Sequence, residues 1–138
     1  MKIQLDTNLV IDILENRRPH VLESAALLNY ALTYHHQLFI TANSVDNIAY
    51  ILRKKISPEG LNKGFSKFFR SVDILPVDRS IILNALSAQW KDLEDAIQYY
   101  AALAANVDLI ATRDVAGFEE QKIKVLNPAE SLKFLEHQ

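Results

Sequence analysis

Short apolar runs alternate with longer amphipathic stretches along almost the whole chain. The runs at residues 3–5 and 109–111 have the length and the mainly apolar character of buried strands, with Gln4 as the one polar residue. Between such runs, apolar residues recur at helical spacing, as at Val21, Ala25 and Leu28. This order predicts an α/β fold, a three-layer α/β/α sandwich with a central parallel sheet, because parallel strands need crossovers that place helices on both faces of the sheet.

The expected elements follow one another without a linker, a repeat or a low-complexity segment, so we expect a single domain over residues 1–138. Strands are expected at residues 3–5, 37–41, 72–75, 109–111 and 125–126. Helices are expected to begin near Leu9, His20, Val45, Pro58, Asp78, Asp92 and Asn127. The chain has only three glycines, which excludes a glycine-rich phosphate-binding loop.

The composition is that of a globular protein, since 49% of the residues are hydrophobic and 23% are charged. The absence of cysteine excludes disulfides, thiolate zinc sites and cysteine nucleophiles. No apolar run reaches the roughly 18 residues of a membrane span, and Asp6 follows the start too closely for a signal peptide, so we expect a cytoplasmic protein. Because the net charge is −2, a polyanionic partner must be held by a local basic patch or through metal ions.

Three aspartates stand where a parallel sheet places its ligands. Asp6 and Asp114 follow expected strands, and Asp95 lies in the first turn of an expected helix. Ligands of such sheets bind beyond the carboxyl ends of the strands. Carboxylates that converge there repel one another, and a bound divalent cation is a good reason to gather them. We therefore expect Asp6, Asp95 and Asp114 to form a shared metal and catalytic site.

The segments around these acids resemble the PIN domain family. The resemblance rests on Asp6-Thr7-Asn8, on Asp92-Leu93-Glu94-Asp95-Ala96 at the start of a helix, and on Thr112-Arg113-Asp114, and it spans essentially the whole chain. It is greatest to the small bacterial toxin-type ribonucleases of the VapC kind. It implies a PIN-like domain that cleaves RNA as a metal-dependent endoribonuclease, with an acidic quartet that holds Mg²⁺ or Mn²⁺. It also implies a homodimer and a cognate antitoxin protein as partners.

The fourth acid of the quartet departs from the family pattern. Aligning residues 40–48 on that pattern puts Asn47 at the usually acidic position, with Asp46 one residue earlier. A shift of one residue turns a helical side chain by about 100°, so both cannot face the site equally well, and we expect Asn47 to face it. An amide oxygen is a weaker partner for a hard cation than a carboxylate. A catalytically weakened PIN fold, kept as a binding or regulatory module, is therefore the alternative.

Supporting roles are expected for residues beside the three aspartates. Asp92 lies one helical turn before Asp95 and is expected either to support the metal ligands or to cap its helix. Thr112 is expected to orient a ligand or a substrate phosphate by hydrogen bonding. Asn8 is expected to position the loop that carries Asp6.

Ordinary structural roles compete with these interpretations. Asp6 alone could cap the helix that follows it, and Glu94 and Asp95 could be first-turn acids favoured by the helix dipole. Asp12 is expected to be a solvated helix acid, and Arg113 either a weak RNA contact or a charge that balances its neighbours. A phosphoacceptor receiver domain has a similar sheet, but it needs an acid pair after the first strand and an aspartate after a middle strand, and this chain has neither.

Overall fold

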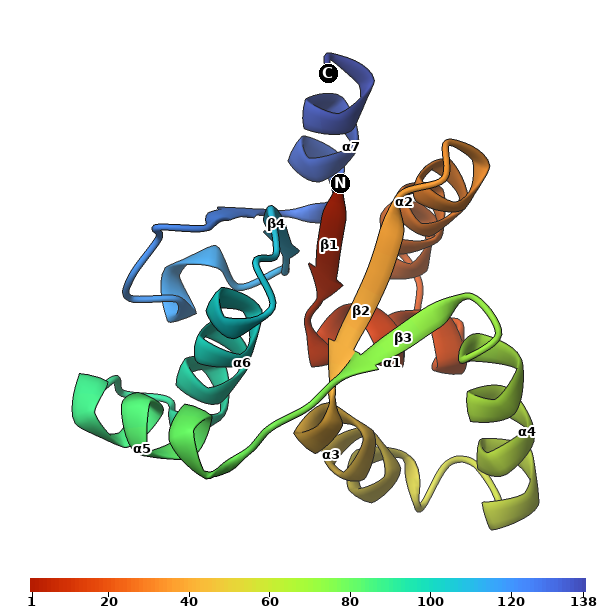
Figure 1. Ribbon diagram of the computed structural model, residues 1–138. Coiled ribbons are helices and arrows are strands. Elements are labelled where there is room, and N and C mark those ends of the chain that lie inside the picture. Colours follow the sequence, from red (N-terminus) through yellow and green to blue (C-terminus); the bar gives the residue numbers. More distant parts are fainter.

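The computed structural model describes residues 1–138 and contains one parallel sheet of five strands in the order β3-β2-β1-β4-β5 (Figure 1). The strands are β1 Lys2–Leu5, β2 Gln37–Thr41, β3 Val72–Leu75, β4 Leu109–Ala111 and β5 Lys124–Leu126. The helices are α1 Thr7–Glu15, α2 His20–Thr33, α3 Ala42–Leu52, α4 Pro58–Phe68, α5 Arg79–Ala88, α6 Leu93–Ala104 and α7 Pro128–Glu136, with a short 3-10 helix, η1, at Val115–Gly117. The predicted α/β architecture with a central parallel sheet is confirmed.

β1 lies in the middle of the sheet, between β2 and β4. The chain adds β2 and β3 on one side of β1 and then returns to add β4 and β5 on the other, so the winding direction reverses between β1 and β4. Leu5 pairs with Ala111 at the carboxyl ends of these two strands, and the backbone N–H of Asp6 donates to the Ala111 carbonyl at 3.0 Å. Open parallel sheets bind ligands at such a switch point, and the chain places Asp6 and Asp114 there.

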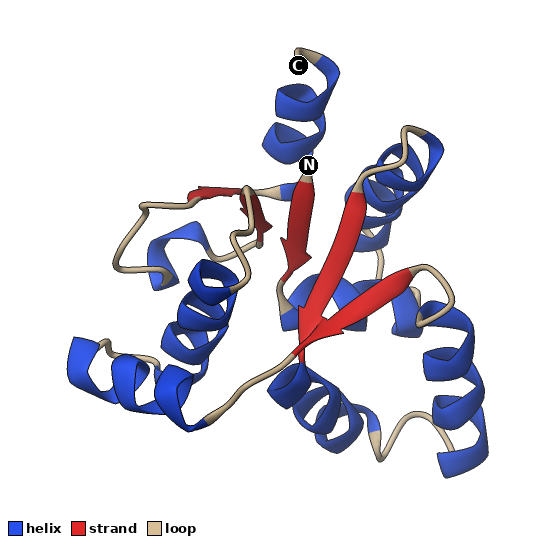
Figure 2. Cartoon of the chain, in the orientation of Figure 1, coloured by secondary structure: helices blue, strands red, loops and turns tan.

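Helices cover both faces of the sheet (Figure 2). On one face, Ile3 and Leu5 of β1 join a buried apolar cluster that includes Leu27 of α2 and Ile48 of α3. On the other face, a second cluster is built around the fully buried Tyr99 of α6. Burial on both sides explains the mainly apolar sequences of the central strands β1 and β4.

Side chains that cap the helices decide where several of them begin. Asp6 accepts from the Thr7 backbone N–H, so α1 starts at Thr7, two residues before the expected start at Leu9. Asp92 caps α6 by accepting from the Asp95 backbone N–H. None of the helices combines the length and the apolar character that a membrane crossing requires.

Candidate active site

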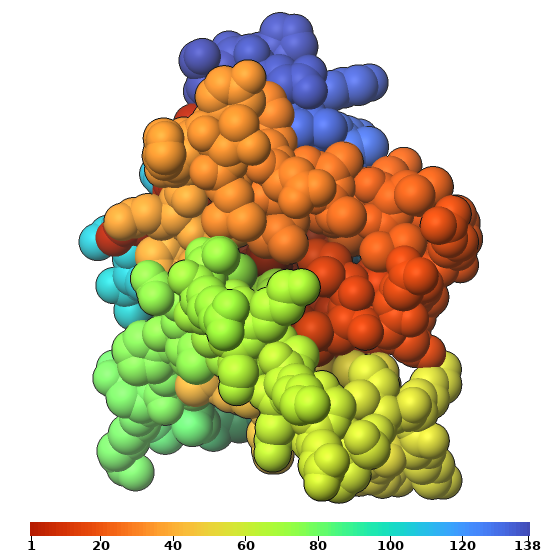
Figure 3. Space-filling view, turned by 90° about the vertical axis from the view of Figure 1, so that its right-hand side faces the viewer, coloured from red at the N-terminus to blue at the C-terminus, as the bar shows by residue number.

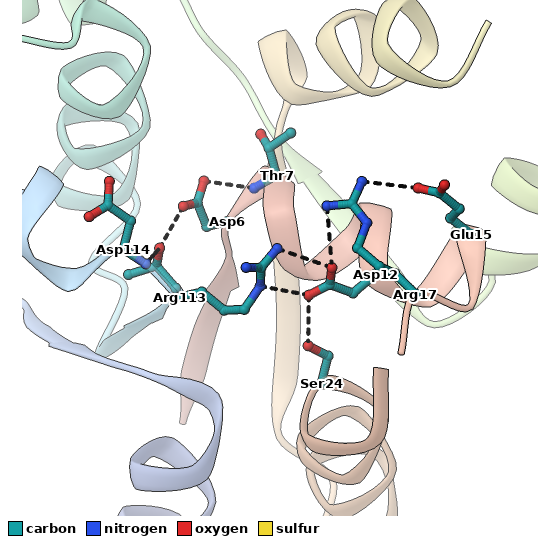
Figure 4. A network of polar contacts seen from close by, with 9 residues as sticks. Asp6, Thr7, Asp12, Glu15, Arg17, Ser24, Arg113 and Asp114 are labelled. Carbon is teal, nitrogen blue, oxygen red and sulfur yellow. Dashed lines mark hydrogen bonds and ion pairs between the residues drawn. The ribbon is translucent and has the colours of Figure 1, made fainter. Parts of the chain in front are cut away.

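Asp6 is the buried centre of the candidate site. Its carboxylate accepts a hydrogen bond from the Thr7 backbone N–H at 2.7 Å, and the residue is only 5% exposed (Figure 4). Burial raises the pKa of Asp6, although hydrogen bonds from Thr112, Gln98 and Thr7 act in the opposite direction. Asp6 is the single residue between β1 and α1, so it caps the helix and also lies at the carboxyl end of the strand, where the site is.

Thr112 connects Asp6 to Asp114. Its buried hydroxyl donates to Asp6 Oδ2 at 2.6 Å and accepts from the Asp114 backbone N–H at 3.0 Å. One side chain after β4 thus fixes the orientation of the Asp6 carboxylate and the backbone that carries Asp114. The structure gives Thr112 a hydrogen-bonding role toward an acidic residue of the site.

The carboxylates of Asp95 and Asp114 converge over Gly117. A Cβ atom built on Gly117 would lie 2.7 Å from Oδ2 of each aspartate, which is closer than real Cβ contacts, so both side chains occupy space that only glycine leaves open. Asp95 is half-buried, and burial raises its pKa to about 8, together with the negative charges of Asp6 and three other neighbouring acids. The ionised carboxylates of the site therefore destabilise the folded protein.

Glu94 is a further acid of this pocket, and sequence reasoning treated it only as a possible first-turn acid. Asn47 Nδ2 donates to both carboxylate oxygens of Glu94 at 2.8 Å, and Thr7 Oγ1 donates to Glu94 Oε1 at 3.2 Å. Asn47 thus faces the pocket, whereas Asp46 is exposed. Burial raises the pKa of Glu94, and the negative charge of Asp6 adds to this effect. The sequence feature that could have pointed to Glu94 is the neutral Asn47 at a position where the resemblance leads us to expect an acid.

These acids line one open pocket of about 310 Å³, which also contains Asn8 and Arg17. The acidic residues around it are Asp6, Asp92, Glu94, Asp95 and Asp114. Asn8 contributes a buried side-chain oxygen, Oδ1, that has no hydrogen-bond partner. The three aspartates predicted to share a site are therefore brought together, and Asp92 and Asn8 lie beside them.

The donor set suits a hard divalent cation. The pocket offers carboxylate oxygens, with neither histidine nor thiolate among its lining residues, and Asn8 Oδ1, a buried atom of one of those residues, has no hydrogen-bond partner. Mg²⁺ and Mn²⁺ prefer such oxygen ligands, whereas zinc prefers nitrogen and sulfur. No group of three acidic or histidine side chains is already arranged as a complete ligand set, so binding a cation would require the carboxylates to move closer together.

Asp12 is not the solvated acid that the sequence predicts. It is fully buried, and Arg113 binds it with two parallel hydrogen bonds, Nε to Oδ2 at 2.9 Å and Nη2 to Oδ1 at 3.1 Å (Figure 4). Ser24 Oγ donates to Asp12 at 3.5 Å, and Arg17 Nη1 lies 3.9 Å from it. The prediction was wrong because the partner of Asp12 is distant in sequence. Of the two roles expected for Arg113, the structure shows charge balance.

A comparison with known protein families agrees with this geometry. The family model described as "PIN domain" matches residues 2–116, which is most of the chain. The chain belongs to the PIN domain family. The matched residues include the Asp6 end of β1, the start of α6 and the Asp114 segment after β4, so the family match covers every acid of the pocket.

The individual relatives include VapC and VapBC proteins. Ribonuclease VapC1 of Aquifex aeolicus (strain VF5) is 26% identical over 134 residues, which cover 94% of this chain and 92% of that protein. Among solved structures, VapBC2 from Rickettsia felis, bound to a DNA fragment from its promoter, superposes with a TM-score of 0.72 at 13% identity, covering 92% of this chain and 98% of that one. VapBC-1 from nontypeable Haemophilus influenzae gives a TM-score of 0.71 at 16% identity, covering 94% and 99%. These structures share the PIN fold.

Proposed function

We propose that this PIN protein is a metal-dependent endoribonuclease that hydrolyses RNA phosphodiester bonds, and that it is the toxin of a toxin–antitoxin pair. The observation that carries the proposal is the convergence of Asp95 and Asp114 over Gly117, beside the buried Asp6. The similarity to Ribonuclease VapC1 supports the reaction, and the similarity to VapBC complexes supports an antitoxin partner.

The acids of the pocket have no cationic side chain bound to them. The four ion pairs of the protein all involve Asp12 or Glu15, which lie along α1 and not at the convergence of Asp95 and Asp114. A cluster of carboxylates that folding brings together without a counter-charge is destabilising until a cation binds. The acids of α1 are ion-paired and the acids of the pocket are not. This contrast favours a site for Mg²⁺ or Mn²⁺ over a network that only supports the fold.

Asp6, Asp95 and Asp114 would hold the metal, with Glu94 and Asn8 as further candidates. A divalent cation held by these residues would supply an activated water and would stabilise the negative charge that develops on the scissile phosphate. The chain itself keeps the Asp6 carboxylate in one orientation through Thr7 and Thr112. The missing side chain of Gly117 lets Asp95 and Asp114 approach each other.

RNA phosphates would meet positive charge at the rim of the site. Lys91 lines the pocket that contains Asp95 and Gly117. Arg17 lines the adjoining pocket of the three aspartates and is also paired with Glu15 at 3.0 Å. Arg113 is engaged by Asp12, so we assign it at most a minor part in RNA binding. A local patch of this kind is what a protein with a net charge of −2 needs in order to hold a polyanion.

Cleavage of RNA by the purified protein tests the proposal. Incubation with Mn²⁺ or Mg²⁺ should produce discrete fragments, and a chelator should stop their formation. A preparation that binds Mn²⁺ but never cleaves RNA would instead favour the second candidate, a catalytically weakened PIN domain that serves as a binding module. The neutral Asn47 at a usually acidic position is the observation behind that candidate.

Gly117→Ala should weaken Mn²⁺ binding about tenfold, because the added methyl group would push the Asp95 and Asp114 carboxylates apart. Gly64→Ala in α4 is the matched control, since its Cβ would meet only Leu14 Cδ2, at the ordinary distance of 3.4 Å. Titration calorimetry should therefore separate the two alanine variants. Equal Mn²⁺ affinities would show that the close approach over Gly117 does not matter for the metal.

A homodimer is the expected assembly. Ile82, Leu83 and Leu86 of α5 are exposed, with Leu93 nearby at the start of α6, and apolar residues gathered on one face mark an interaction surface. We expect light scattering to give twice the monomer mass and Leu86→Asp to give a monomer. Leu22→Asp on α2 is the control, because Leu22 is as exposed but lies outside this face. A monomeric wild-type protein at high micromolar concentration would contradict the dimer.

An antitoxin would need apolar surface away from the acids. The protein has such a surface in a pocket of about 430 Å³ between α1, α2 and α4, which includes Leu14, Leu28 and Phe68, and Figure 3 shows the face where these helices meet. An RNA substrate and an antitoxin partner are consistent with a cytoplasmic protein. We also propose that residues 1–138 act as one PIN domain. Which RNA is cleaved depends on surface shape and is a matter for cleavage mapping.

A further inference from the structure

The contact between Asn47 and Glu94 joins two helices at the edge of the pocket. Asn47 lies on α3 and Glu94 on α6, and the Asn47 amide nitrogen lies 2.8 Å from each Glu94 oxygen. An amide NH₂ group only donates, so Asn47 Nδ2 acts as a donor shared between the two oxygens of one carboxylate. Position 47, where the resemblance to the PIN family leads us to expect an acid, thus carries a donor that holds an acid from a different helix.

Neutral groups hold the remaining sides of the Glu94 carboxylate. Thr7 Oγ1 donates to Glu94 Oε1 at 3.2 Å, and Gln98 Nε2 does so at 3.4 Å. The single hydrogen of Thr7 serves either Glu94 or Ser44 Oγ, which lies 3.1 Å away. No Lys, Arg or His is paired with Glu94. Glu94 is therefore oriented by its neighbours without being neutralised by them.

The orientation differs from that of an ordinary first-turn acid. Such an acid stabilises its helix from solvent through the dipole and needs no side-chain partners. Glu94 instead reaches across to the start of α1 and to α3, and it lines the same pocket as Asp6 and Asp95. The negative charge of Glu94 adds to the repulsion among the carboxylates of the pocket, and a cation bound to the aspartates would offset this repulsion as well.

We propose that Glu94 supplies the fourth carboxylate of the metal site, and that Asn47 is a positioning residue that holds both Glu94 oxygens toward the pocket. This inference rests on the proposed metal-dependent function. The fourth acid then comes from α6, and the amide on α3 directs it. The site then keeps four acids, Asp6, Glu94, Asp95 and Asp114, despite the neutral residue at position 47.

Titration calorimetry with Mn²⁺, in the absence of RNA, tests the inference. Glu94→Gln keeps the size of the side chain and should weaken Mn²⁺ binding about 10- to 100-fold, and Asn47→Ala should weaken it about tenfold through loss of orientation. Asp46→Asn is the matched control, since it removes one negative charge from the exposed neighbour of Asn47 and should leave the affinity unchanged. Thermal melting of each metal-free variant checks that it is folded.

The double variant Asn47→Asp with Glu94→Gln separates a ligand role from a packing role. It returns the acid to α3 and the amide to α6, so it keeps a hydrogen bond between the two positions and should recover most of the affinity lost in Glu94→Gln. Wild-type affinity in Glu94→Gln, with the expected loss in Asp6→Asn, would overturn the role of Glu94 and leave the metal site standing. Absence of Mn²⁺ binding by the wild-type protein would overturn both.

Discussion

Replacing Asp6 or Asp95 by asparagine should lower the rate of RNA cleavage at least about 100-fold, which corresponds to about 2.7 kcal/mol of transition-state stabilisation. Each substitution keeps the shape of the side chain but removes a negative charge from the proposed metal ligands. Initial rates with saturating Mn²⁺ on one RNA substrate measure the effect. Asp46→Asn removes an exposed charge and should stay within about twofold of the wild-type rate.

Of these two substitutions, Asp95→Asn should also stabilise the metal-free protein at neutral pH. The pKa of Asp95 is about 8 in the folded state, against about 3.9 for an unfolded aspartate. The folded state therefore binds more protons between these values, and its stability falls as the pH rises from about 4 to 8. Because Asp95 is half-exposed, solvent screening reduces the effect to about 1–2 kcal/mol.

Thermal melting in a chelator at about pH 5 and pH 8 measures this difference. The wild-type protein should lose more stability over the interval than Asp95→Asn does. A loss of activity without this gain in stability would mean that the substitution disturbs the fold. A loss of activity together with the gain in stability would identify a carboxylate that destabilises the metal-free protein and binds the cation. Near-wild-type cleavage by Asp6→Asn or Asp95→Asn would show that the site is assigned to the wrong residues.

Arg113→Leu should lower the free energy of unfolding by about 3 kcal/mol, because it leaves the fully buried Asp12 without its main counter-charge. Arg17 Nη1 lies 3.9 Å from Asp12 and offsets part of this cost. Urea denaturation measures the change. Arg53→Leu removes an exposed arginine that stacks on Tyr50 and should change the stability by no more than about 0.5 kcal/mol.

Replacing Asp12 and Arg113 together by leucine tests the ion pair itself. A buried ion pair exchanged for apolar residues of similar volume is often nearly neutral, so the double variant should be more stable than Arg113→Leu alone. If Arg113 served mainly to bind RNA, Arg113→Leu would instead unfold at the wild-type urea concentration and bind RNA more weakly. Stability and RNA affinity thus distinguish the two roles that the sequence leaves open for this arginine.

The sheet could be predicted because its strands are marked by local patterns. A buried parallel strand is apolar along its length, and the helix that follows shows a stripe at helical spacing, so each element identifies itself within a few residues. The acids at the strand ends could be predicted as a group for the same reason, since parallel strands deliver their carboxyl ends to one edge. Asp6 and Asp114 meet there as the sequence predicts.

The remainder of the site depends on contacts between residues far apart in the chain. Asp12 and Glu94 look alike in the sequence, as acids on amphipathic helices, yet one is neutralised by Arg113 and the other is held by Asn47. The rotation of each helix about its axis decides which neighbours a carboxylate meets. A sequence pattern does not fix this rotation to within one residue, which is about 100°. Only the folded structure separates a buried ion pair from an acid available to a cation.

The bond between Arg113 and Asp12 also constrains how this protein can change over generations. Arg113 stands between Thr112 and Asp114, so the same three-residue segment that orients the acids is fastened to the middle of α1. Loss of either charge alone would leave the other without its partner and would loosen the segment that carries Asp114. Descendants of this chain would therefore inherit Asp12 and Arg113 as a unit, and substitution at one position would open the way to substitution at the other.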